Sequence, residues 1–98
     1  MQTVVSAQFA GPIDLESWVQ TLQERSGASV ALEAPSGRFN SGTLTFGGSE
    51  KVFFVIWRER FRIGIEVNGT LTDRERTCLL VLREMGGDLG SRGSWEGY

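Results

Sequence analysis

The chain has 98 residues, of which 40% are hydrophobic and 22% are charged, and its formal net charge is −2. This composition is typical of one small globular domain and argues against a disordered chain. The net charge argues against a protein that holds nucleic acid by bulk electrostatics, which requires a strongly basic face.

Cysteine and histidine usage narrows the chemistry further. Cys78 is the single cysteine, so an internal disulfide is excluded and a reducing compartment fits. Histidine is absent, which removes Ser–His and Cys–His nucleophilic pairs and histidine-based metal sites. The start of the chain has no signal-peptide pattern, and no stretch approaches the roughly 20 apolar residues that span a bilayer. We therefore expect a soluble, cytoplasmic protein without membrane contact.

The first predicted elements are a strand and a helix. Residues 3–9 alternate between two faces, which is typical of a half-buried strand. Gly11 and Pro12 end this strand, and Asp14 is a good N-cap for the helix that follows. Gly27 can supply the left-handed residue that ends the helix. Apolar residues recur along the helix at i, i+3, i+4 and i+7, namely Leu15, Trp18, Val19 and Leu22.

Two short strands follow. Val30 and Leu32 alternate with polar or small residues, which predicts a second strand. The segment APSGRFNSG, residues 34–42, has the composition of a loop. Leu44 and Phe46 alternate with threonines and predict a short third strand.

Residues 50–69 are too long and too apolar for one strand of a small sheet, and they predict a hairpin. Pairing residues whose numbers sum to 117 places the loop around Arg58 and Glu59. A four-residue loop fits better than a two-residue loop, because Arg58 and Glu59 suit a primed turn poorly. One face of this hairpin is wholly apolar, with the pairs Ile56–Phe61, Phe54–Ile63 and Val52–Ile65.

The other face of the predicted hairpin combines aromatic and charged residues. Opposite charges, an aromatic ring over a glycine and a cation over an indole are all favourable cross-strand partners. The expected pairs on this face are Lys51–Glu66, Phe53–Gly64, Val55–Arg62 and Trp57–Arg60.

A second helix follows the hairpin. Thr72 and Glu75 have the spacing of a capping box, in which each side chain accepts from the other residue's backbone amide. Gly86 and Gly87 end the helix. Its apolar face consists of Cys78, Leu79, Val81, Leu82 and Met85.

The segment LTDRER, Leu71 to Arg76, resembles the start of the first helix in the helix-turn-helix domain of LuxR-type response regulators. The resemblance implies DNA binding, for which a recognition helix must follow. The residues after this helix are instead rich in glycine, and the capping box alone accounts for Thr72 and Glu75. We interpret the segment as a helix start. A double-stranded-RNA-binding domain is rejected too, since its second helix begins with a lysine cluster.

These elements predict an α+β fold, a two-layer sandwich of order β-α-β-β-β-β-α. Both helices are expected on one face of a mainly antiparallel sheet of four to five strands. Residues 1–86 form the expected single domain, and residues 87–98 a glycine-rich flexible tail or linker.

The sequence contains no recognisable catalytic pattern. Its 12 acidic residues are scattered, Cys78 falls in the apolar part of a helix, and no phosphate-binding glycine motif is present. We expect no catalytic residues, no cofactor and no metal site, and therefore no enzyme.

The outer face of the hairpin, residues 51–67, is the candidate site. Helices on one side of the sheet leave the other side open, and Trp and Arg dominate binding hot spots. The alternative is that the tail or the first strand covers this patch within the monomer. The expected contact residues are Phe53, Val55, Trp57, Arg60 and Arg62.

The function that these residues favour is a non-enzymatic protein-interaction or regulatory module. It self-associates through the outer face, as a homodimer, or binds another protein. A single-stranded nucleic-acid binder is the alternative, with Trp57 and Phe53 stacking on bases while Arg60 and Arg62 hold phosphates. The net charge disfavours nucleic acid. A further alternative is the ligand-sensing front domain of a larger transcriptional regulator, whose small-molecule ligand the sequence does not identify.

Overall fold

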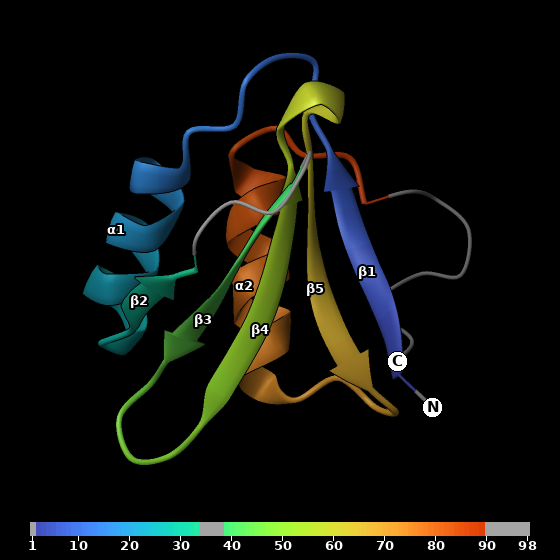
Figure 1. The fold of residues 1–98 in the computed structure, drawn as a ribbon. Coiled ribbons are helices and arrows are strands. Elements are labelled where there is room, and N and C mark those ends of the chain that lie inside the picture. Colours follow the sequence, from blue (N-terminus) through green and yellow to red (C-terminus); the bar gives the residue numbers. More distant parts are fainter. Residues whose placement is uncertain (1, 34–38, 90–98) are drawn as a thin grey trace.

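The computed structural model describes residues 2–33 and 39–89 (Figure 1). Within these ranges, strands and helices follow in the order β-α-β-β-β-β-α, with a short 3-10 turn before the last strand. The elements are β1 (Gln2–Gln8), α1 (Leu15–Ser26), β2 (Ser29–Leu32), β3 (Phe39–Thr45), β4 (Lys51–Trp57), the turn η1 (Arg58–Arg60), β5 (Arg62–Asn68) and α2 (Asp73–Glu84).

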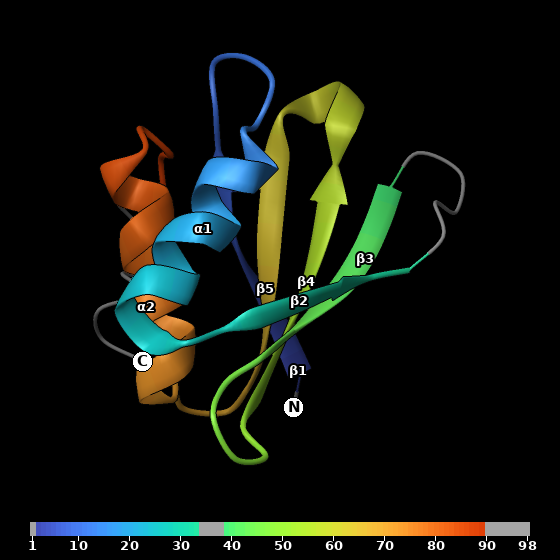
Figure 2. The same cartoon turned by 90° about the vertical axis from the view of Figure 1, so that its left-hand side faces the viewer.

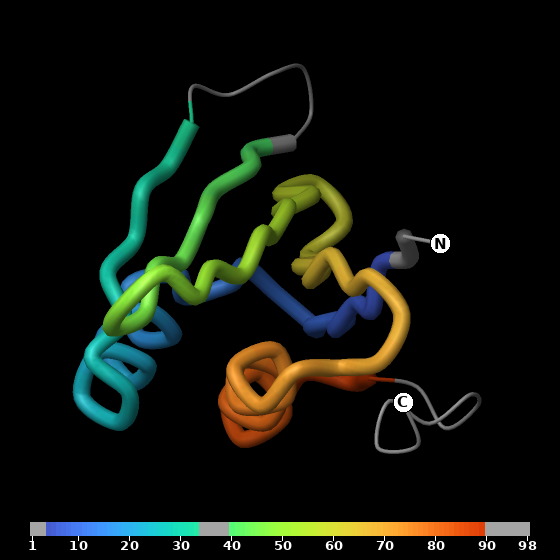
Figure 3. Tube along the Cα trace, turned by 90° about the horizontal axis from the view of Figure 1, so that it is seen from below, coloured from blue at the N-terminus to red at the C-terminus, as the bar shows by residue number. Residues whose placement is uncertain are grey.

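The strands form one antiparallel sheet in the order β1-β5-β4-β3-β2. The first strand therefore lies beside the last, and β1 and β2 are the two edge strands among the described elements. Both helices lie on the same side of the sheet (Figures 2 and 3). The predicted α+β fold of two layers is confirmed.

Local capping signals place both helices. An Asp14 carboxylate oxygen accepts a hydrogen bond from the Ser17 amide at 3.1 Å, and this bond lowers the pKa of Asp14 below its usual value. Gly27 ends α1 in the left-handed region with φ 68°. At the start of α2, Thr72 and Glu75 form the predicted capping box, with hydrogen bonds of 3.1 and 2.8 Å. The expected helix starts are therefore confirmed.

The hairpin of β4 and β5 has a different register from the predicted one. Its pairs sum to 119 rather than 117, so Ile56 lies opposite Ile63 and Trp57 lies opposite Arg62. The loop is Arg58 to Phe61, and Phe61 closes it in the left-handed region with φ 52°. A shift of two residues keeps the side chains of β4 and β5 on their predicted faces, so hydrophobic pattern alone cannot distinguish these registers.

Charge matching misled the register prediction. The expected pair of Lys51 with Glu66 is worth only a few tenths of a kcal/mol to about 1 kcal/mol. In the structure Lys51 lies opposite Thr45 on β3, and Glu66 lies opposite Val4 on β1. The pairing of β4 with β3 and of β5 with β1, which the sequence did not predict, therefore contributes more to the register than the single pair of Lys51 with Glu66.

The prediction of a loop over residues 34–42 is wrong for its last four residues, because β3 begins at Phe39. From Phe39 to Thr45, β3 pairs with β4 along its whole length. Asn40 is buried there and accepts a 2.7 Å hydrogen bond from Nε of Arg58. Pairing and burial thus override the loop-like composition of these residues.

Trp18 joins the two layers of the molecule. Its side chain is fully buried, and its ring meets Phe54 of β4 edge-on, with 5.1 Å between ring centroids. The indole Nε1–H donates a 3.2 Å hydrogen bond to the backbone carbonyl of Cys78 in α2. Trp18 of α1 therefore packs its ring against the sheet and forms a hydrogen bond to α2, which gives its buried N–H group a partner.

The chain remains packed for a short distance beyond α2. Gly87 is buried, and Asp88 exchanges two backbone hydrogen bonds of 2.9 Å with Gln8 at the end of β1. Leu89 packs against the core. The rest of the expected tail, residues 90–98, lies outside the described residues, as does any cover that it gives to the sheet.

Gly42 offers a test of sheet packing. A Cβ at this position would lie 2.5 Å from Cζ of Phe54 and 3.0 Å from the backbone oxygen of Ala31. We expect Gly42→Ala to lower the free energy of unfolding by about 1–3 kcal/mol, because the buried ring must move. Urea denaturation followed by tryptophan fluorescence measures this change.

Gly47→Ala is the matched control, because a Cβ there meets nothing within 4 Å. We expect its free energy of unfolding to be unchanged or slightly raised. Equal destabilisation by both substitutions would contradict the close approach of Phe54 to Gly42.

Candidate functional site: the uncovered face of the sheet

The side of the sheet opposite the helices is the candidate site. Within residues 2–33 and 39–89, no helix lies over this side (Figures 2 and 3). We call it the outer face. Its central side chains come from four strands and are Val4, Ser6, Gln8, Ser41, Thr43, Phe53, Val55, Trp57, Arg62 and Glu66.

The structure brings four of the five predicted contact residues onto the outer face. Phe53 is 48% exposed, and Val55 and Trp57 beside it on β4 are half-buried. Arg62 lies on β5 opposite Trp57. Arg60 does not pair with Trp57 as predicted, but lies in the turn η1 at the end of the hairpin.

Trp57 lies across β5 rather than standing out into solvent. A Cβ built on Gly64 would lie 3.1 Å from Cζ3 of the indole and would clash with Cγ1 of Val4. The sequence predicts an aromatic cover for this glycine, but assigns it to Phe53. The absence of a side chain at Gly64 therefore leaves room for the edge of the Trp57 ring and for Val4 from β1.

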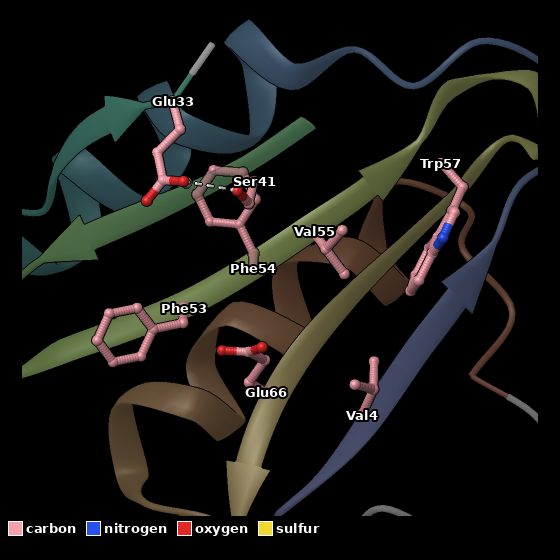
Figure 4. A pocket seen from close by; sticks show the side chains of 9 residues that line it. Val4, Glu33, Ser41, Phe53, Phe54, Val55, Trp57 and Glu66 are labelled. Carbon is pink, nitrogen blue, oxygen red and sulfur yellow. Dashed lines mark hydrogen bonds between the residues drawn. The ribbon is translucent and has the colours of Figure 1, made fainter. Parts of the chain in front are cut away.

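A hollow of about 500 Å³ lies on the outer face. Its apolar lining includes Phe53, Val55 and Trp57, and Val4 extends it onto β1 (Figure 4). Its acidic lining consists of Glu33 and Glu66.

One hydrogen bond orients the polar rim of this hollow. The Ser41 hydroxyl donates to a Glu33 carboxylate oxygen at 3.0 Å (Figure 4). The predicted site residues did not include Val4, Glu33, Ser41 and Glu66. The alternation of β1 did put Val4 on the polar side of its strand, but only the β1–β5 pairing brings it next to Glu66.

The side chain of Gln8 forms hydrogen bonds to the arginine-rich end of the hairpin. Its Oε1 accepts a hydrogen bond from Nε of Arg62 at 3.1 Å, and its Nε2 donates to the backbone oxygen of Arg60 at 2.6 Å. Arg58 donates to Asn40, so the side chains of two of the three arginines at this end, Arg58 and Arg62, form hydrogen bonds within the chain. The hairpin end is thereby held in place beside Trp57.

Cys78 is a core residue in the structure. Its side chain is buried, and burial raises the pKa of its thiol to about 12. A thiol with this pKa carries almost no thiolate at neutral pH, and thiolate is the nucleophilic form. Among the described residues, no three Cys, Asp or Glu side chains gather in a way that suits a metal ion. The described helices are also too short or too polar to cross a membrane.

Thiol labelling tests this placement of Cys78. At about pH 8 we expect the folded protein to react with a disulfide reagent roughly a thousandfold more slowly than the urea-unfolded chain. In the folded protein the pKa of the Cys78 thiol lies above its usual value of 9.0. The contribution of the buried protonated thiol to the free energy of unfolding is therefore complete below pH 9.0 and is lost as the pH rises toward 12. Cys78→Ala should weaken this alkaline loss of stability. Rapid labelling of the folded protein would contradict the burial.

Comparisons with protein-family models, with curated proteins and with solved structures find no match to this chain. Its function is therefore inferred from the geometry and chemistry of the described residues.

Proposed function

We propose that this domain is a non-enzymatic protein-interaction module that forms a homodimer through its outer face. The exposed ring of Phe53 carries the proposal, because it lies on the central strand of the sheet, on the outer face that no described helix covers. Burying the exposed half of this ring in an interface contributes on the order of 2 kcal/mol. Val55 and Trp57 extend the apolar surface along β4 from Phe53.

The charges on this face suit pairing with an identical face. Arg62 lies toward one end of the outer face, and Glu66 and Glu33 line the hollow. In a dimer with twofold symmetry the same patch meets itself, so a face with both signs can match its own opposite charges. A uniformly charged face would repel its copy.

The same observations support a protein partner over single-stranded nucleic acid. Two carboxylates, Glu33 and Glu66, line the hollow in which bases would have to stack. One edge of the Trp57 ring lies against Gly64 and the side chain is half-buried, which reduces the ring surface available for stacking. The chain carries a net charge of −2, which opposes phosphate binding. A regulatory role within a larger protein stays a prediction from the sequence.

Phe53→Glu tests the dimer directly. A twofold interface contains each substitution twice, so we expect the dimer dissociation constant to rise at least about 100-fold. Light scattering after size exclusion should show a wild-type mass that increases with concentration from 10.8 kDa toward twice that value. The variant should stay at 10.8 kDa. The double variant Val55→Glu with Trp57→Ala should behave in the same way and remain folded.

Leu80→Glu is the matched control, because Leu80 is 39% exposed on α2, on the other side of the sheet. It should dimerise like the wild type. A wild-type mass of 10.8 kDa at every concentration would refute the homodimer. Salt-sensitive quenching of tryptophan fluorescence by oligo(dT) would instead support nucleic-acid binding.

A further inference from the structure

A second apolar hollow lies between α1 and the edge strand β2, away from the outer face. It has a volume of about 380 Å³, and β2 diverges from α1 beside it (Figure 2). Leu15 and Val19 contribute from α1, and Val30 and Leu32 contribute from β2. Although they face the helix layer, Val30 and Leu32 are 38% and 49% exposed. The helix therefore leaves this part of the inner face of the sheet incompletely covered.

At the same two residues, the backbone N–H and C=O groups of β2 point away from β3. The Glu33 amide donates to the Ser41 carbonyl oxygen at 2.9 Å, so the hydrogen-bonding groups of Glu33 point toward β3. Backbone direction alternates along a strand, so those of Val30 and Leu32 point away from β3. No described strand pairs with that edge. Within residues 2–33 and 39–89, the backbone groups of Val30 and Leu32 at this edge thus have no strand partner, and their apolar side chains line the hollow.

β2 is short, but its residues lack the side-chain devices that usually prevent strand addition. Exposed edges are commonly protected by lysine, proline, a bulge or an inward-pointing charge. The four residues of β2 are Ser29, Val30, Ala31 and Leu32, and none of them is charged or proline. A strand edge beside an apolar groove is the arrangement with which proteins bind extended peptides, through backbone hydrogen bonds and alternate side chains.

We propose that the β2 edge binds an extended peptide of another protein as an additional strand. The peptide places two apolar side chains, two residues apart, in the hollow between α1 and β2. Cross-strand neighbours share a face of the sheet, so these two residues are also the ones whose backbone pairs with Val30 and Leu32.

The negative charge of Glu16 beside the hollow favours a basic peptide. Among the residues that line the hollow, Glu16 is the only charged one, and Gln20 and Gln23 are neutral. A lysine or arginine two residues beyond the apolar pair of the peptide would share its face of the strand and lie near Glu16. A second copy of this chain is a poorer occupant, because its own β2 brings no basic residue to Glu16.

Fluorescence anisotropy with short labelled peptides tests the proposal. The probes carry the pattern Lys-Thr-X-Thr-X-Thr-Lys, with Val, Leu or Phe at both X positions. We expect at least one probe to bind with a dissociation constant below about 1 mM. Methylation of the two X backbone nitrogens should abolish binding, and replacing both lysines by glutamate should weaken it. If none of the three basic probes binds, or if the methylated probe binds equally well, the proposal is overturned.

Protein variants locate the site. Leu32→Lys should weaken the best probe at least about tenfold without unfolding the protein, since Leu32 is half exposed. Glu16→Lys should reverse the preference between the basic and the acidic probe. Leu80→Lys, a substitution of an exposed leucine on α2, should bind like the wild type. Undiminished binding to Leu32→Lys refutes the assignment to β2.

Amide hydrogen exchange gives a readout that does not depend on affinity. On binding, the amides of Val30 and Leu32 should gain protection, whereas the amide of Ala31, which faces β3, should change little. The measurement is made in the Phe53→Glu background, so that failure of the proposed dimer does not affect it. Protection confined to the outer face would refute the β2 site.

Discussion

The contact of Trp18 with Phe54 and with the Cys78 carbonyl is the interaction on which the arrangement of layers depends. It ties α1 to the sheet and to α2 in the interior, where the indole N–H must have a partner because water cannot reach it. The same contact keeps both helices on one side of the sheet. The aromatic and acidic residues of the outer face are consequently left without a helix over them.

The two proposed surfaces use different parts of the same sheet. The outer face offers side chains, with an exposed Phe53 and a Trp57 whose ring edge lies against Gly64, and it carries charges of both signs. The β2 edge offers backbone groups together with a small apolar hollow. Side-chain surfaces suit a partner of fixed shape, whereas a free strand edge suits a chain that can extend along it.

The arginine-rich hairpin end shows how the tertiary structure changes the meaning of a sequence pattern. The sequence predicts Arg60 and Arg62 as cations available to a partner and places Arg58 in the hairpin loop. In the structure Arg58 bonds to the buried Asn40, and Arg62 bonds to Gln8. Both partners come from strands far away in the sequence, so no local pattern could assign them. These two arginines stabilise the hairpin end and thereby the position of Trp57.

The amino-acid sequence by itself determined the helices, the inner face of the hairpin formed by β4 and β5, and the class of fold. These features rest on short-range signals, namely capping residues within four positions and alternation within one strand. Only the tertiary structure decided the hairpin register, the extension of β3 back to Phe39, and the exposure of β2. Registers two residues apart bury the same side chains, so the choice between them depends on strands brought alongside by the fold. Val30 and Leu32 likewise have the pattern of a half-buried strand, and they remain exposed because α1 diverges from the edge that they form.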